Sequence, residues 1–230
     1  TRALGIPAVV GLAALPIGRV DGREAVVDGD QGRVYLQPSP AVAAAYQLRV
    51  REAEALAARL GALRDEPSEP PDGVRVPLQV NIGLIAELAP ALASGAEGIG
   101  LFRTEFAFLA RETFPAEDEQ YLLYRTVLES FAPKPVTLRT LDVGGDKSLP
   151  YFPMVEDNPF LGCRGIRFTL DHPEIFLIQL RAMLRANAGL HNLQVLFPMI
   201  GRVDEMDEAL GLLTRAYREL VAEGQAVAKP

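Results

Sequence analysis

From residue 74 to residue 223 the sequence alternates between strand-like and helix-like patterns, and this alternation restricts the fold more than any other feature. Short runs of β-branched and aliphatic residues are followed by longer segments in which apolar residues recur at helical spacing. Successive strand–helix units form a parallel sheet covered by helices. The predicted pairs are Val74–Ile82 with Leu84–Ser94, Gly98–Thr104 with Ala116–Phe131, Val136–Asp142 with Asp171–Ala188, and Leu193–Met199 with Val203–Glu223. We predict an α/β fold, either an open sheet or the first half of a (β/α)8 TIM-type barrel, because a complete barrel needs roughly twice the residues available here.

The first 73 residues differ in composition from the alternating region. Residues 1–40 contain short apolar runs separated by Asp-Gly turn signals, and they predict a small β-rich piece too short to bury its own core. Residues 41–64 are rich in Ala, Leu, Arg and Glu and predict a helix. Residues 65–73, DEPSEPPDG, predict a linker, so we expect a domain boundary there.

Composition excludes several classes of function. The net charge of −7 argues against a nucleic-acid partner, and the absence of a long apolar run argues against a membrane span. The N-terminal residues do not resemble a signal peptide, and the only cysteine, Cys163, excludes an internal disulfide. The two histidines, His172 and His191, are far apart and predict no zinc-type site. These features predict a soluble, cytoplasmic chain without a zinc-type site.

Two of the predicted strands end in an Arg-Thr pair, Arg103-Thr104 and Arg139-Thr140. In α/β enzymes the reacting groups lie where strands give way to loops. A guanidinium matches phosphate or carboxylate oxygens two at a time, so two arginines at one rim predict a clamp for a substrate that carries both groups. The alternative is that each arginine only pairs with a nearby acid, Glu105 or Asp142.

Further basic residues follow the third predicted strand: Lys147, Arg164 and Arg167. Together with Arg139 they predict an anion site, and the alternative is a set of exposed cations with loose partners. Gly144-Gly145 could cradle phosphate through backbone N–H groups, although Gly-Gly in a loop is a weak signal.

The remaining polar candidates are assigned supporting or structural roles. Asn81, at the end of the first strand, orders the rim, touches the ligand or is a plain turn residue. Asp142 and Asp146 orient the arginines or approach a metal, and orientation is the favoured role. We predict that Cys163 is a buried side chain with a packing role and not a nucleophile. Neither histidine has a sequence neighbour that would make it a catalytic base.

Four segments resemble enzyme I of the bacterial phosphotransferase system, the phosphoenolpyruvate–protein phosphotransferases. They are GAEGIGLFRTEFAFL (95–109), TLRTLDVGGDKSLPYF (137–152), NPFLGCRGIR (158–167) and LFPMI (196–200). They occur in the family's order and spacing, and the resemblance extends over essentially the whole chain. The segment TLDHPEIFLIQLRAMLRAN is especially similar to the nitrogen-related paralogue.

The resemblance implies a domain organisation and a substrate site. It implies that residues 1–40 are the C-terminal tail of a swivelling phosphohistidine domain, 41–73 a helical linker, and 74–230 the N-terminal half of a phosphoenolpyruvate-binding (β/α)8 barrel. It also implies that Arg103 and Arg139 bind phosphoenolpyruvate, with the supporting residues Asn81, Asp142, Lys147, Arg164 and Arg167.

For the parent protein the resemblance implies a cytoplasmic, Mg²⁺-dependent, homodimeric enzyme. It would transfer the phosphoryl group of phosphoenolpyruvate to its own histidine and then to a small phosphocarrier protein. The family's acceptor histidine, Mg²⁺ ligands and active-site cysteine have no counterpart in this sequence, so we expect no catalytic residue and no turnover in this chain. The alternatives are a non-catalytic module that associates through open sheet edges, or part of an enzyme like pyruvate phosphate dikinase or phosphoenolpyruvate synthase.

Overall fold

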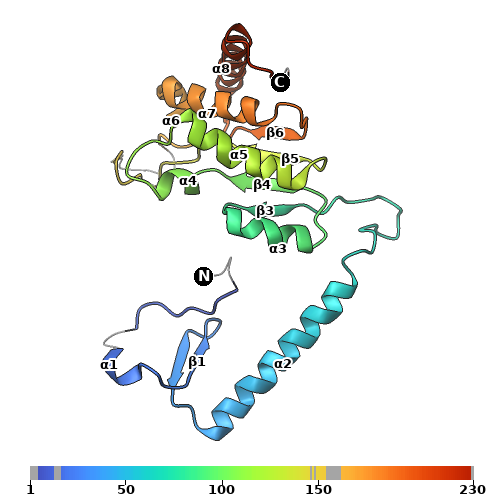
Figure 1. The fold of residues 1–230 in the computed structure, drawn as a ribbon, viewed down its shortest axis with the longest axis vertical. Coiled ribbons are helices and arrows are strands. Elements are labelled where there is room, and N and C mark those ends of the chain that lie inside the picture. The colour runs from blue at the N-terminus through green and yellow to red at the C-terminus, as the bar shows by residue number, and fades with distance from the viewer. Residues whose placement is uncertain (1–4, 13–16, 146, 148, 154–161, 229–230) are drawn as a thin grey trace. The chain divides into compact units, whose positions relative to one another are not determined.

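A computed structural model of the chain describes residues 5–12, 17–145, 147, 149–153 and 162–228 (Figure 1). The chain divides into two compact units, Thr1–Pro67 and Ser68–Pro230. Among the described residues, no helix combines the length and apolar character that crossing a bilayer requires.

The first unit is a small hairpin followed by a long helix. Its elements are α1 (Ile17–Val20), β1 (Ala25–Asp28), β2 (Arg33–Leu36) and α2 (Pro40–Ala62). β1 and β2 pair antiparallel, as the Asp-Gly turn signals predicted. Ser39 caps α2 by accepting a hydrogen bond from the amide of Val42, and Pro40 occupies the first turn, where its missing N–H costs nothing.

A buried carboxylate, Asp28, joins the hairpin to α2. Its Oδ1 accepts hydrogen bonds from the amides of Asp30 and Gln31, and its Oδ2 accepts one of 2.7 Å from the Tyr46 hydroxyl. The hydrogen bond from Tyr46 lowers the pKa of Asp28, and the same bond raises the pKa of Tyr46 to about 12. Among the described residues of this unit, no side chain of α2 is itself buried.

The second unit is a four-stranded parallel sheet with the order β3-β4-β5-β6. Its strands are β3 (Val80–Ile82), β4 (Ile99–Arg103), β5 (Val136–Arg139) and β6 (Leu193–Leu196). Its helices are the 3-10 turn η2 (Ile85–Glu87), α3 (Leu88–Ala93), α4 (Phe106–Leu109), α5 (Glu117–Phe131), α6 (Ile166–Asp171), α7 (Pro173–Ala186) and α8 (Val203–Ala222). The predicted α/β fold with a parallel sheet is therefore confirmed.

Three features differ from the sequence prediction. The first strand is limited to β3, because Val74, Val76 and Leu78 are exposed instead of facing the core. The third helix begins at Pro173, since Asp171 ends α6 and His172 holds the N-cap position. The short helices α1, α4 and α6 were not predicted.

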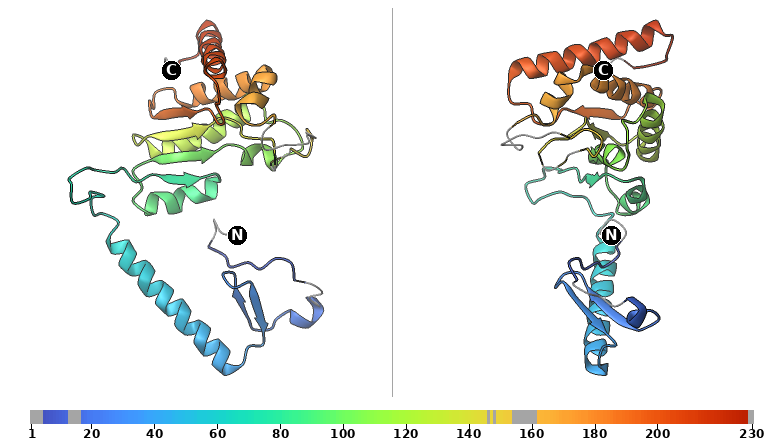
Figure 2. Two further views of the ribbon diagram at one scale, coloured as in Figure 1. Left: turned by 180° about the vertical axis from the view of Figure 1, so that it is seen from behind. Right: turned by 90° about the vertical axis from the view of Figure 1, so that its left-hand side faces the viewer.

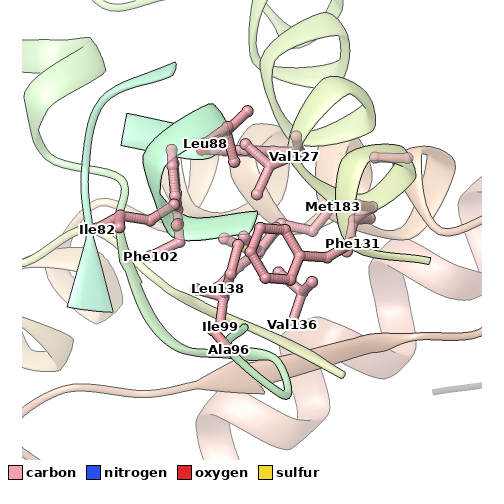
Figure 3. Packing of buried hydrophobic residues seen from close by; sticks show 14 of the residues in the cluster. Ile82, Leu88, Ala96, Ile99, Phe102, Val127, Phe131, Val136, Leu138 and Met183 are labelled. Carbon is pink, nitrogen blue, oxygen red and sulfur yellow. The ribbon is translucent and has the colours of Figure 1, made fainter. Parts of the chain in front are cut away.

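The hydrophobic core lies between the sheet and the helices α3, α5 and α7 (Figures 2 and 3). Within β5, Val136 and Leu138 are completely buried in this core, whereas Thr137 and Arg139 are not. This alternation is the period of a strand with one covered face. A second cluster packs α7 against α6 and α8.

The face of the sheet away from these helices carries several polar side chains. Thr137 on β5 donates a hydrogen bond of 2.9 Å to the amide oxygen of Gln194 on β6, and both side chains are exposed or partly exposed. Asn81 of β3 is exposed, and its amide oxygen lies close to Gly100 of β4. The sheet therefore has one buried apolar face and one face of mixed character, which also carries Leu101 and Leu196.

Replacement of Leu138 by alanine tests the position of the core. Leu138 is fully buried at the centre of the sheet, so Leu138→Ala is expected to lower the free energy of unfolding by about 2–5 kcal/mol. Leu122 on α5 is 63% exposed, and Leu122→Ala is expected to change it by less than about 0.5 kcal/mol. Urea denaturation measures both values. Equal losses in the two variants would contradict this arrangement of the core.

Candidate anion-binding site

The register of the sheet brings the two predicted clamp arginines together. Arg103 and Arg139 are the last residues of β4 and β5, and they are directly paired across these parallel strands. Neither is fully exposed. The carboxyl ends of the strands therefore form a rim on which two arginines are neighbours.

The threonine of each Arg-Thr pair has a structural role. Thr104 donates a hydrogen bond of 2.7 Å from Oγ1 to the carbonyl oxygen of Arg139, and Thr140 lies 3.5 Å from the carbonyl oxygen of Leu196. Both threonines are completely buried. Each pair thus contributes an arginine to the rim and a threonine that ties its strand end to the next strand.

Two buried carboxylates, Glu105 and Asp142, hold three cations at the rim. Glu105 Oε1 lies 2.6 Å from Arg139 Nη2 and 2.9 Å from Lys147 Nζ. Asp142 Oδ2 lies 3.2 Å from Arg139 Nη2 and 3.3 Å from Lys147 Nζ, and its Oδ1 accepts a 3.1 Å hydrogen bond from Arg164 Nε. The side chains of Glu105 and Asp142 are 2% and 4% exposed. The structure therefore groups Arg139, Lys147 and Arg164, as the sequence suggested.

The pKa of Asp142 lies below its ordinary value. Burial alone would raise it, but the hydrogen bond from Arg164 and the charges of Arg139 and Lys147 outweigh burial. Asp142 is therefore ionised at neutral pH and contacts three cations. Its role in orienting them stays a prediction.

Arg103 has different surroundings from Arg139. Its guanidinium lies over the ring of Phe106, 5.3 Å from the centroid. Within the described parts of the chain no carboxylate is within ion-pair distance of it, and its Nε is buried without a hydrogen-bond partner. The alternative of simple pairing with nearby acids thus describes Arg139 but not Arg103.

Other predicted residues lie outside this cluster. Arg167 donates to the carbonyl oxygen of Gly162 and lies 3.6 Å from Glu205, rather than contacting the two rim carboxylates. Asn81 is in the middle of β3, and Asp146 lies outside the described residues. The roles of Asn81 and Arg167 remain predictions.

Gly144 brings a distant segment of the backbone to the rim. A Cβ at this position would lie 2.4 Å from the carbonyl oxygen of Cys163 and 2.9 Å from Cα of Arg164. Gly144 and Lys147 also exchange two backbone hydrogen bonds of 3.1 Å. The glycine is thus explained by close approach of the segment that carries Arg164, a role the sequence did not reveal.

The cysteine and the histidines have structural surroundings. Cys163 is partly buried against an apolar cluster, with Sγ 3.6 Å from Asp171 Oδ2. The ring of His172 packs against those of Phe152 and Phe168, with centroid distances of 5.1 and 4.8 Å. His191 occupies a turn with φ of 57°. None of these contacts is a nucleophile–base arrangement.

A buried polar network on the helix side of the rim was missed by sequence reasoning. Gln179 of α7 accepts a 2.8 Å hydrogen bond from the Leu141 amide and donates to Thr104 and to the hydroxyl of Tyr124. Tyr124 donates to Gln120, and Gln120 donates to the carbonyl oxygen of Pro115. The only sequence signal is a glutamine among apolar residues of a helix, which does not identify its partners.

The described residues do not fit a magnesium site. Both rim carboxylates are already shared by cationic side chains, and the described part of the chain contains no group of three or more metal-binding side chains.

A separate cavity of about 460 Å³ is lined by residues of α4, α5 and the loop between them, including Ala107, Arg111 and Leu123. Arg111 is paired with Glu119 there, so the cavity is not a second cationic site.

Acid titration tests the role of Asp142. Because its folded pKa is below the ordinary 3.8, its contribution to stability is complete above that pH and is lost as the pH falls through the folded pKa. Asp142→Asn is expected to lower the free energy of unfolding by about 3 kcal/mol or more at neutral pH. The difference from the unmodified chain is expected to shrink below pH 3.8.

The control is Asp118→Asn, since Asp118 is 80% exposed and is expected to contribute less than about 1 kcal/mol. Urea denaturation between pH 2 and 7 measures both differences. A penalty for Asp142→Asn that stays constant over this range would show that its charge is not responsible.

Comparison with known proteins identifies the family. Residues 57–230 match the family described as PEP-utilising enzyme, PEP-binding domain. The whole chain is 48% identical to a protein of Salmonella typhimurium named Phosphoenolpyruvate-dependent phosphotransferase system, of which it covers 31%. It is 44% identical, over 98% of its length, to the Phosphoenolpyruvate-protein phosphotransferase of Bacillus subtilis, of which it covers 40%. The chain thus spans about a third of the length of these relatives and, by its match over most of its residues, belongs to the family of PEP-utilising enzymes and contains sequence of their PEP-binding domain.

Proposed function

We propose that the chain is the part of a phosphoenolpyruvate–protein phosphotransferase that binds phosphoenolpyruvate. The observation that carries this proposal is the cationic rim at the carboxyl ends of β4 and β5, which belongs to a chain with a net charge of −7. Among the described residues, the three cations Arg103, Arg139 and Lys147 outnumber the two rim carboxylates, Glu105 and Asp142. The family match and the names of the relatives support the same substrate.

The chemistry of the substrate fits this rim. Phosphoenolpyruvate carries a phosphate and a carboxylate on a small planar frame, and both groups accept paired hydrogen bonds from guanidinium groups. Arg103 and Arg139, paired across neighbouring strands, are the two clamp residues. Lys147 and Arg164 are supporting cations, and Asp142 keeps them near Arg139.

The same cations suit phosphoryl transfer. In the loose transition state the negative charge spreads over the oxygens of the transferring group. Cations that are already held in place by buried carboxylates stabilise this charge without reorganising. In the proposed parent protein the phosphoryl group goes to a histidine outside this chain and then to a small carrier protein. Mg²⁺ would be bound by residues outside this chain, as the resemblance to enzyme I implies.

The proposed domain organisation follows from the fold and the family. Residues 74–230 are the N-terminal half of a (β/α)8 barrel, supported by the sequential order of four parallel strands and by helices on one face. Residues 1–40 are the tail of a phosphohistidine domain and 41–73 a linker. The parent protein is proposed to be a cytoplasmic homodimer.

Calorimetric titration with phosphoenolpyruvate and Mg²⁺ tests the substrate. We expect saturable binding to the chain and at least a tenfold loss in Arg139→Ala, because the variant removes a charge-assisted contact worth about 1.5–3 kcal/mol. Arg215 lies on α8, is 60% exposed and pairs with Glu219. Arg215→Ala therefore removes the same charge far from the rim in sequence and should leave the affinity unchanged.

Two results would count against the clamp. Binding that is equally strong in Arg139→Ala would show that this arginine does not contact the ligand. Equal weakening in Arg139→Ala and Arg215→Ala would show that only net charge matters.

The variant Arg103→Ala tests whether Arg103 contributes to phosphoenolpyruvate affinity without contributing to stability. Arg103 is not needed to neutralise a described carboxylate, so its removal leaves no unpaired buried charge. We expect the melting temperature of Arg103→Ala to stay close to that of the unmodified chain while phosphoenolpyruvate affinity falls at least about tenfold. A fall in stability with unchanged affinity would reverse this assignment. Thermal denaturation and calorimetry on one preparation give both values.

A further inference from the structure

The side chain of Gln179 links the ends of two strands from behind the rim. It comes from α7, and the residue is 1% exposed. Its Oε1 accepts a 2.8 Å hydrogen bond from the amide of Leu141, and its Nε2 donates to Thr104 Oγ1 at 3.2 Å. One helical residue therefore contacts both segments that leave β4 and β5.

These contacts lie next to the rim residues in the sequence. Thr104 stands between Arg103 and Glu105, and Leu141 stands directly before Asp142. Beyond Arg139 the chain leaves β5, and the Leu141 amide is satisfied by Gln179. The direction in which the chain leaves the strand, and hence the position of Asp142, depends on this hydrogen bond.

The hydrogen-bond directions around Gln179 are mutually consistent and allow one orientation of its amide. Thr104 uses its hydroxyl proton for the carbonyl oxygen of Arg139, so it accepts from Gln179. Tyr124 uses its proton for Gln120, so it also accepts from Gln179. Burial raises the pKa of Tyr124, which keeps its hydroxyl protonated. The amide oxygen of Gln179 is thereby directed to Leu141.

Packing of α7 against the sheet does not explain why residue 179 is a glutamine. The neighbouring residues Leu180, Ala182 and Met183 are completely buried and already pack α7 against the other elements. An apolar residue at position 179 would avoid the cost of burying an amide. The specific result of having glutamine there is that two strand ends are held at a fixed separation.

We propose that Gln179 is a positioning residue for phosphoenolpyruvate binding, acting through Thr104 and Leu141 on the arginines and carboxylates of the rim. This inference rests on the proposed function, since it concerns the same site. Gln179 does not touch the ligand in this proposal. It sets the geometry of Arg139, Glu105 and Asp142 before the ligand arrives.

Two variants of the same network separate positioning from general stability. Gln179→Met keeps a side chain of similar length and removes the hydrogen bonds to Leu141 and Thr104. Tyr124→Phe also removes buried hydrogen bonds of the network but leaves both of those bonds in place. Both variants are expected to lower the melting temperature by several degrees.

Binding and a spectroscopic signal of Arg139 are then compared in the two variants. We expect the dissociation constant for phosphoenolpyruvate to rise about tenfold in Gln179→Met and less than about twofold in Tyr124→Phe. In the ligand-free protein, the Nε–Hε NMR signal of Arg139 is expected to shift or broaden in Gln179→Met only. Thr104→Val, which removes the hydroxyl between Gln179 and the Arg139 carbonyl, is expected to behave like Gln179→Met and serves if that variant does not fold.

The outcomes distinguish this inference from the proposed function. If the unmodified chain does not bind phosphoenolpyruvate, the proposed function fails, and the Arg139 signal still decides whether Gln179 positions the rim. If binding is intact and the Arg139 signal is the same in Gln179→Met and Tyr124→Phe, the inference is wrong. The inference would also be overturned if both variants lost affinity in proportion to their loss of stability.

Discussion

The burial of two carboxylates at the strand ends is the interaction on which the rest of the site depends. A buried carboxylate costs several kcal/mol unless it is paired and hydrogen-bonded. Asp142 meets this requirement through both oxygens and Glu105 through Oε1, and together they hold Arg139 and Lys147 beside the more distant Arg164. The cations are therefore fixed by charge neutralisation, and strand geometry alone would not place all three.

The strand ends place arginines at the rim and threonines in the buried layer. Parallel register places Arg103 beside Arg139, and the two-residue period of the strands sends the following threonines into the buried layer. The Arg-Thr pair thus has the same structural arrangement at the end of β4 and at the end of β5. Its arginine stays at the rim and its threonine fixes the carbonyl of the next strand.

Much of this arrangement could be predicted from local patterns. Strand–helix alternation predicted a parallel sheet covered by helices, and charged residues at strand ends indicated the rim. The pattern did not show that Val74, Val76 and Leu78 are exposed, because apolar content alone does not say which side a residue faces. Helices of four to six residues such as α4 and α6 are too short for a helical period. The contacts of Gly144 and Gln179 join segments far apart in sequence, so no local window contains them.

Buried polar atoms without hydrogen-bond partners occur mainly at the rim and not in the network behind it. Four buried side-chain atoms of the described residues lack hydrogen-bond partners, and three of them are Arg103 Nε, Arg139 Nε and Glu105 Oε2. Behind the rim, the side-chain amide of Gln179 and the hydroxyl of Tyr124 are satisfied. Buried unsatisfied groups are rare in folded proteins and call for a physical explanation. The unsatisfied atoms therefore concentrate on rim residues, whereas the network behind the rim is satisfied.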